Sequence, residues 1–124
     1  MIIFVITAIA AQLAQPSKAS GSEFIRLLHS YQDCARSKAM QFGKADETVA
    51  NTVSAALTAC RSERASIVLY MNGEKKADGS ERWPLEKADR FVTDLVDNPL
   101  HDELTTSLFE VRSEDSDADH SKAR

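Results

Sequence analysis

Two cysteines constrain this chain more than any other feature, because each lies in a segment that predicts a helix. Apolar residues recur with helical spacing over residues 20–43 and again over residues 46–72. Cys34 lies on the first apolar stripe and Cys60 on the second. A disulfide between them would close a loop of about 27 residues and join the two helices as an antiparallel hairpin. The predicted fold class is therefore all-α.

The ends of both helices carry sequence signals. Residues 20–23 match a capping box, and Gly43 is predicted to end the first helix in the left-handed conformation that glycine tolerates. Asp46 is predicted to be the N-cap of the second helix, which should end at residues 72–73. Residues 66–71 would also suit a strand, since their Ile-Val-Leu-Tyr run favours extended structure. We expect helix there because no partner strand follows.

The disulfide has to satisfy the geometry of this hairpin. Cys34 and Cys60 face each other in a symmetric hairpin whose apex is residue 47, whereas the turn signals centre near residue 44 or 45, an offset of about five residues across the pair. The mismatch amounts to roughly 7 Å along the helices, which is the limit for a disulfide. The sequence favours the disulfide and leaves two alternatives, a pair of buried free thiols and a redox-active pair. A zinc site would need two further ligands that no recognised spacing supplies.

The second half of the chain predicts a loop, two shorter helices and a tail. Residues 72–83 are rich in glycine and charge, and Pro84 suits the first turn of a third helix. Asn98-Pro99 predicts the start of a separate fourth helix. Residues 113–124 contain no apolar side chain larger than alanine, which predicts a disordered acidic tail. One helical domain over residues 20–112 follows, with the shorter helices packed over the apolar seam of the hairpin.

Residues 1–19 have the layout of a secretory signal peptide. The thirteen positions from residue 2 to residue 14 are uncharged, Pro16 breaks the run, and a small-x-small site ends at Ala19. No basic residue precedes the run, which departs from the usual pattern. A membrane span needs about 20 apolar residues, so this segment is too short for one. We expect cleavage between Ala19 and Ser20, a periplasmic or extracellular location, and no stable membrane insertion afterwards.

The charge of the predicted mature chain argues against two classes of partner. Removal of residues 1–19 takes away one base, Lys18, and leaves 14 basic and 19 acidic residues, a net charge of −5. Nucleic acid and anionic membrane surfaces would repel such a chain. We therefore expect no nucleic acid partner and predict that the partner is another protein.

No motif in the sequence points to catalysis, so we predict no enzyme, no cofactor and no metal site. The chain has neither a nucleophile elbow nor a phosphate-binding glycine loop. His29 and Asp33 lie four residues apart and could form half a metal site, while His101 stands beside acids in a helical first turn. The acidic tail around His120 lacks the glycine and glutamate of a calcium loop. These residues are too few for a site.

Two further side chains have simple structural interpretations. Trp83 precedes a proline at a helix entry, and we expect it to pack there, with an exposed interface role as the alternative. Arg64 falls near the apolar stripe of the second helix, and we expect its aliphatic stem to lie along that stripe with the charge in water.

In size, predicted location and cysteine count, the chain resembles small helical periplasmic proteins with one disulfide, acid-stress chaperones among them. No motif residue carries this resemblance. The sequence therefore predicts an exported non-enzymatic protein that acts by binding another protein. Two alternatives remain: a stress chaperone that exposes its apolar seam in acid, and a small metal-binding protein that uses His29, Asp33 and His101.

Overall fold

The computed structural model describes the backbone of residues 16–44 and 46–122, and side chains within residues 21–114. Most of the predicted signal peptide, residues 1–15, lies outside the described residues, and so do the side chains at the predicted cleavage site. The described elements in chain order are α2 (Pro16–Phe42), α3 (Val49–Ala59), α4 (Arg61–Asn72), α5 (Leu85–Val92), the π-helical η1 (Thr93–Asp97) and α6 (Asn98–Lys122).

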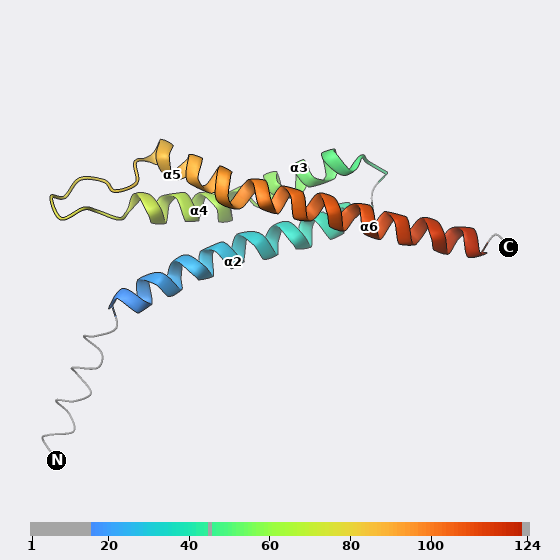
Figure 1. The fold of residues 1–124 in the computed structure, drawn as a ribbon, viewed down its shortest axis with the longest axis horizontal. Helices are drawn as coiled ribbons and strands as arrows, with labels where there is room; N and C mark the ends of the chain where they lie inside the picture. The colour runs from blue at the N-terminus through green and yellow to red at the C-terminus, as the bar shows by residue number, and fades with distance from the viewer. Residues whose placement is uncertain (1–15, 45, 123–124) are drawn as a thin grey trace, which may run out of the picture.

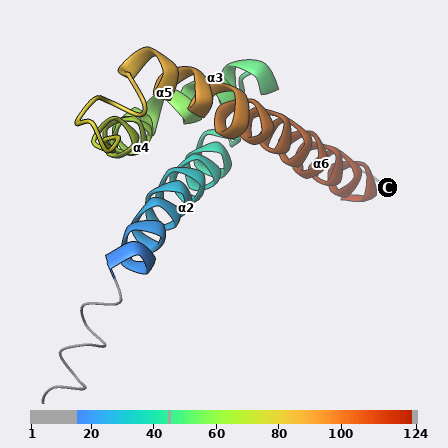
Figure 2. The ribbon, with the colours of Figure 1, turned by 60° about the vertical axis from the view of Figure 1, so that its left-hand side comes forward.

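Three helical rods form the fold, and the predicted all-α class is confirmed (Figure 1). Helix α2 packs antiparallel against α3 and α4, and the rod formed by α5, η1 and α6 packs along α4 and α3. Figure 2 shows that α2 and α6 meet near the α2–α3 turn and diverge away from it.

The core lies where the three rods face one another. Tyr31, Ile67 and Leu108 are among its largest fully buried side chains, and one comes from each rod. Buried residues of the third rod recur every four positions. In a regular α-helix, residues four apart differ by about 40° in direction around the helix axis, so a stripe with this spacing gradually rotates away from the core. The π turn contains the equivalent of one extra residue, and this rotates the stripe by about 100° in the opposite direction, toward the core again. This stripe comprises Ala88, Val92, Val96, Leu100, Leu104 and Leu108.

The predicted disulfide is present and joins α2 to the junction of α3 and α4. The Cα atoms of Cys34 and Cys60 lie 6.0 Å apart. The mismatch that the sequence indicated is smaller in the structure, because α3 begins only at Val49 and the centre of the turn therefore lies between residues 45 and 46. The disulfide thus fixes the register between the first two rods.

The second predicted helix differs from the structure at its start and in its middle. Its N-cap is Thr48 and not Asp46, because the Thr48 hydroxyl accepts a hydrogen bond from the backbone N–H of Asn51 at 3.1 Å. The helix is also interrupted at Cys60, whose backbone leaves the helical region at φ −102° and ψ 20°. Residues 66–71 are helical, as expected.

Gly43 follows the last residue of α2, but not in the left-handed conformation that the sequence predicts. Among the described glycines a positive φ occurs only at Gly79. A Cβ at Gly43 would lie 2.8 Å from Cδ2 of Leu108 and 2.9 Å from the carbonyl oxygen of Ala39. A side chain here would therefore have to displace the Leu108 side chain of α6 and would crowd the last turn of α2 itself.

The third and fourth predicted helices form one rod and not two. Asn98 and Pro99 lie within this rod, because the π turn η1 connects α5 to α6 without a break in the helix. The N–H of Asn98 donates to the carbonyl of Thr93, five residues back. A proline ring normally clashes with the carbonyl four residues earlier, here Leu95, and the wider π turn accommodates it.

The backbone of α6 extends to Lys122. The side chains from residue 115 onward lie outside the described residues, so the acidic tail expected over residues 113–124 stays a prediction. No helix in the described part of the chain is long and apolar enough to cross a membrane.

Reduction of the Cys34–Cys60 disulfide should lower the free energy of unfolding by about 3 to 4 kcal/mol, because it frees the intervening loop in the unfolded chain. Chemical denaturation with and without a phosphine reductant measures this difference. The double variant Cys34→Ala with Cys60→Ala should be insensitive to the reductant. A reductant effect of equal size in that variant would contradict the assignment.

Candidate functional site

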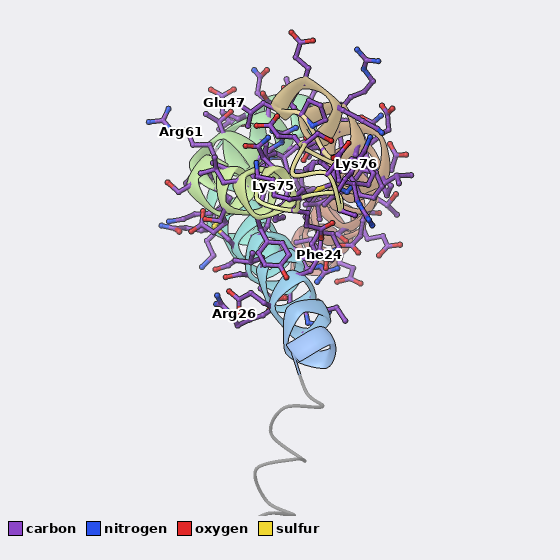
Figure 3. All side chains as sticks on the ribbon, turned by 90° about the vertical axis from the view of Figure 1, so that its left-hand side faces the viewer. Phe24, Arg26, Glu47, Arg61, Lys75 and Lys76 are labelled. Carbon is purple, nitrogen blue, oxygen red and sulfur yellow. A yellow bond between two sulfur atoms is a disulfide. The ribbon has the colours of Figure 1, made fainter. Side chains whose placement is uncertain are left out.

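A hollow of about 320 Å³ lies at the end of the bundle remote from the α2–α3 turn. We call it the aromatic groove. In Figure 3, which views this end, Phe24 lies on α2 below the loop that carries Lys75 and Lys76. Its lining comes from α2, the end of α4, the following loop and α5, and consists of Phe24, Met71, Glu74, Arg82, Trp83 and Phe91.

Aromatic contacts hold the rings of the groove in place. The rings of Trp83 and Phe91 meet edge to face with their centroids 5.1 Å apart, and Lys87 Nζ lies 5.0 Å from the Trp83 ring. The side-chain amide of Asn72 donates to the carbonyl of Trp83 at 2.9 Å. Trp83 therefore packs at the helix entry, as predicted, and it is also half-exposed in the groove.

The loop over residues 73–84 is structured and sets the position of Trp83. Lys75 and Glu81 form an isolated antiparallel bridge, and Gly79 takes up the tight turn with φ +87°. The Asp78 carboxylate accepts hydrogen bonds from the Ser80 hydroxyl and backbone N–H, which hold the pKa of Asp78 below its usual value. This small hairpin brings the chain back to α5 at the rim of the groove.

A second feature is a network of polar side chains that joins all three rods. The guanidinium group of Arg64 on α4 donates to Asp97 at 2.7 Å, to Asp89 at 2.6 Å and to Thr93 at 2.9 Å. The hydroxyl of Tyr31 on α2 donates to the same Asp97 at 2.7 Å. Burial, followed by the bond to Asp97, raises the pKa of Tyr31 well above its usual range. The phenol therefore stays a donor in the folded protein.

Arg64 corrects one prediction from the sequence. Only 22 % of its side chain is exposed, and its charge points into the network and not into water. Asp89, Thr93 and Asp97 were also missed as partners. Their spacing of four residues beside an apolar stripe was the available signal, because it places all three on one edge of a helix.

The polar residues that the sequence singled out do not converge. His29 and Asp33 are exposed, and Asp33 pairs with Arg36 at 3.4 Å. His101 is exposed and lies 3.8 Å from Asp102, its neighbour in sequence. The side chain of His120 lies outside the described residues.

Among the side chains that the structure describes, one group of three metal-ligand types comes together. It consists of the two disulfide sulfurs and the carboxylate of Glu63, whose ligand atoms all lie within 4.8 Å of one another. Glu63 stands in the first turn of α4, three residues after Cys60. Glu63 was not among the predicted site residues, because the sequence pointed only to the two cysteines as a pair.

Another hollow, of about 570 Å³, lies beside the α2–α3 turn. Apart from the Phe42 ring, its walls carry small or polar side chains, including the amides of Gln41 and Asn51. It offers one aromatic ring where the aromatic groove offers three. The aromatic groove is thus the better candidate for a binding site.

Comparison with protein-family models, curated proteins and solved structures finds no match to this chain. The chemistry of the described side chains therefore carries the functional argument. Two features stand out among these side chains. One is a polar network that joins helices, and the other is a half-exposed aromatic surface that no helix of the described chain covers.

The substitution Arg64→Met should lower the free energy of unfolding by about 2 to 3 kcal/mol, because it leaves the carboxylate of Asp97 partly buried without its charged partner. Arg36→Met is a matched control, since Arg36 also joins two rods through Glu103 but both side chains are nearly half-exposed, at 45 % and 46 %. That control should cost less than about 1 kcal/mol. Urea denaturation measures both, and equal losses would contradict the structural weight given to Arg64.

Proposed function

We propose that this chain is an exported, non-enzymatic protein that binds another protein through the aromatic groove. The observation that carries the proposal is the gathering of Phe24, Trp83 and Phe91 from three different elements at one end of the bundle. Tryptophan and other aromatic side chains contribute disproportionately to protein–protein affinity when a partner covers them. A partner would place apolar side chains against the exposed parts of these rings.

The charged groups at the rim support a binding role over a catalytic one. Among the residues that line the groove, only Glu74 and Arg82 carry charge. This pair supplies neither a nucleophile nor an acid and base aligned on one reacting atom. Charges at the edge of an apolar patch are instead typical of the polar rim of an interface.

Two features support export. Residues 1–19 have the layout of a signal peptide. The chain also uses both of its cysteines in one disulfide, and disulfides persist mainly in oxidising compartments such as the bacterial periplasm. We therefore place the mature protein in the periplasm or outside the cell.

Photo-crosslinking in an exporting cell tests the proposal. A photoreactive amino acid at Glu74 should give a defined crosslinked protein, whereas the same group at Glu110 on α6 should not. Phe24→Ala should weaken the capture by about tenfold, because the partner loses one of three rings.

The intact mass of the recovered chain reports export, since it should lack residues 1–19.

Phe109→Ala provides the matched control for Phe24→Ala, because Phe109 is 61 % exposed and lies on α6 outside the groove. Capture should be unchanged in this variant. Equal loss in both variants, or crosslinking of equal yield from both positions, would exclude the groove as the binding surface. A full-length mass with free thiols would exclude export.

A second candidate function, an acid-activated chaperone, is favoured by the way carboxylates join the rods. Arg36 on α2 donates to Glu103 on α6 at 2.7 Å and lowers the pKa of Glu103. Because the pKa of Glu103 is lower in the folded protein than its ordinary value of 4.5, its ionised carboxylate stabilises the folded state at pH values above 4.5. That stabilisation is lost as the pH falls below 4.5 through the folded pKa, because the unfolded chain then binds more protons.

Acidification should therefore weaken the contact between α2 and α6, and the chaperone function requires that core side chains become exposed when this contact is lost. We expect near-ultraviolet circular dichroism to weaken, and the protein to suppress aggregation of an acid-denatured client, at about pH 3. Glu103→Gln should reduce the part of the pH dependence that falls below pH 4.5. A domain that stays cooperatively folded in acid and protects no client would exclude the chaperone function.

A further inference from the structure

We propose that reduction of the disulfide converts Cys34, Cys60 and Glu63 into a three-ligand site for a thiophilic divalent cation such as Zn²⁺. The fourth position would hold water. This site lies about 15 Å along α2 from Phe24, so the inference does not rest on the proposed role of the aromatic groove.

The distances suit one tetrahedral ion. The two sulfurs and a carboxylate oxygen of Glu63 lie within 4.8 Å of one another, and the cysteine Cα atoms are 6.0 Å apart. Ligands of one zinc ion, at about 2.3 Å for sulfur and 2.0 Å for oxygen, stand about 3.6 Å from each other. Small rotations of the three side chains therefore suffice, and the helices can stay in place.

The local backbone brings two of the three ligand side chains together. Cys60 is the residue at which α3 ends and α4 begins, and Glu63 lies in the first turn of α4. Three residues separate the two side chains, which places them on one face of the helix.

Access and competition also favour the site. Cys60 is fully buried, whereas Cys34 and Glu63 are only half-buried, so an ion can approach from their side. Glu63 takes part in none of the salt bridges formed among the described residues. Asp33, which neighbours Cys34 in sequence, is instead paired with Arg36 and lies outside the group.

The redox step balances with an external dithiol as reductant. The dithiol gives two electrons and two protons, the bond between the sulfurs of Cys34 and Cys60 breaks, and two thiols form. The reductant becomes a disulfide. Binding of Zn²⁺ then releases the two thiol protons to solvent, so affinity should rise with pH.

Metal titration of the full chain tests the inference. The protein is reduced anaerobically with a phosphine, which becomes the phosphine oxide with oxygen from water, and is then titrated with Zn²⁺ in a calorimeter. We expect one ion per chain in the reduced protein and none in the oxidised protein. Co²⁺ in place of Zn²⁺ should give the charge-transfer absorption of thiolate ligands. No uptake beyond that of the oxidised protein would overturn the proposal.

Two carboxylate variants separate a ligand from a bystander. Glu63→Gln should weaken Zn²⁺ binding by about tenfold or more, whereas Asp33→Asn should leave it unchanged. Equal affinity in Glu63→Gln and the unsubstituted chain would reject Glu63 as a ligand. If reduction loosens the fold, Zn²⁺ should restore the helical circular dichroism of the reduced chain, and failure to restore it would equally overturn the proposal.

Discussion

The half-buried guanidinium group of Arg64 is the contact on which the arrangement of the three rods depends. A charge in that position is tolerated only when its partners surround it, so α4 and the third rod have few other ways to pack. Asp97 accepts from both Arg64 and Tyr31 and thereby includes α2 in the same constraint. The disulfide cannot replace this network, because it joins only the first two rods.

The aromatic groove follows from this arrangement. Tyr31 and Asp97 hold α2 and the third rod together at one level of the bundle. Toward the N-terminal end of α2 the two rods diverge (Figure 2), and the hollow lined by Phe24, Trp83 and Phe91 lies at that end. A candidate binding surface thus arises where the polar network stops.

Apolar spacing was sufficient to predict which segments are helical, because burial of a stripe decides that locally, but it misplaced several helix ends, such as the start of α2 at Pro16. The cysteine pair predicted the disulfide, and the glycine and charge content of residues 72–83 predicted the loop. The interruption at Cys60 and the π turn before Pro99 could not be read in the same way. Each depends on a neighbouring rod. The interruption at Cys60 depends on the position of Cys34 in α2, and the π turn depends on keeping the buried stripe of the third rod against the core. The environment of Arg64 was predicted wrongly because its carboxylate partners are distant in sequence. The aromatic residues of the groove are visible in the sequence, but the sequence does not show that they come together in space.

The position of the disulfide has one more consequence, for proteolysis. The exposed residues 46–48 lie inside the loop that Cys34 and Cys60 close, so a cut there leaves both fragments covalently joined. The hairpin over residues 73–84 lies outside that loop, and a cut there leaves α5 and α6 attached by packing and hydrogen bonds alone. Cleavage of one peptide bond should therefore preserve the fold when it occurs near the α2–α3 turn and should disrupt the fold when it occurs in the hairpin over residues 73–84.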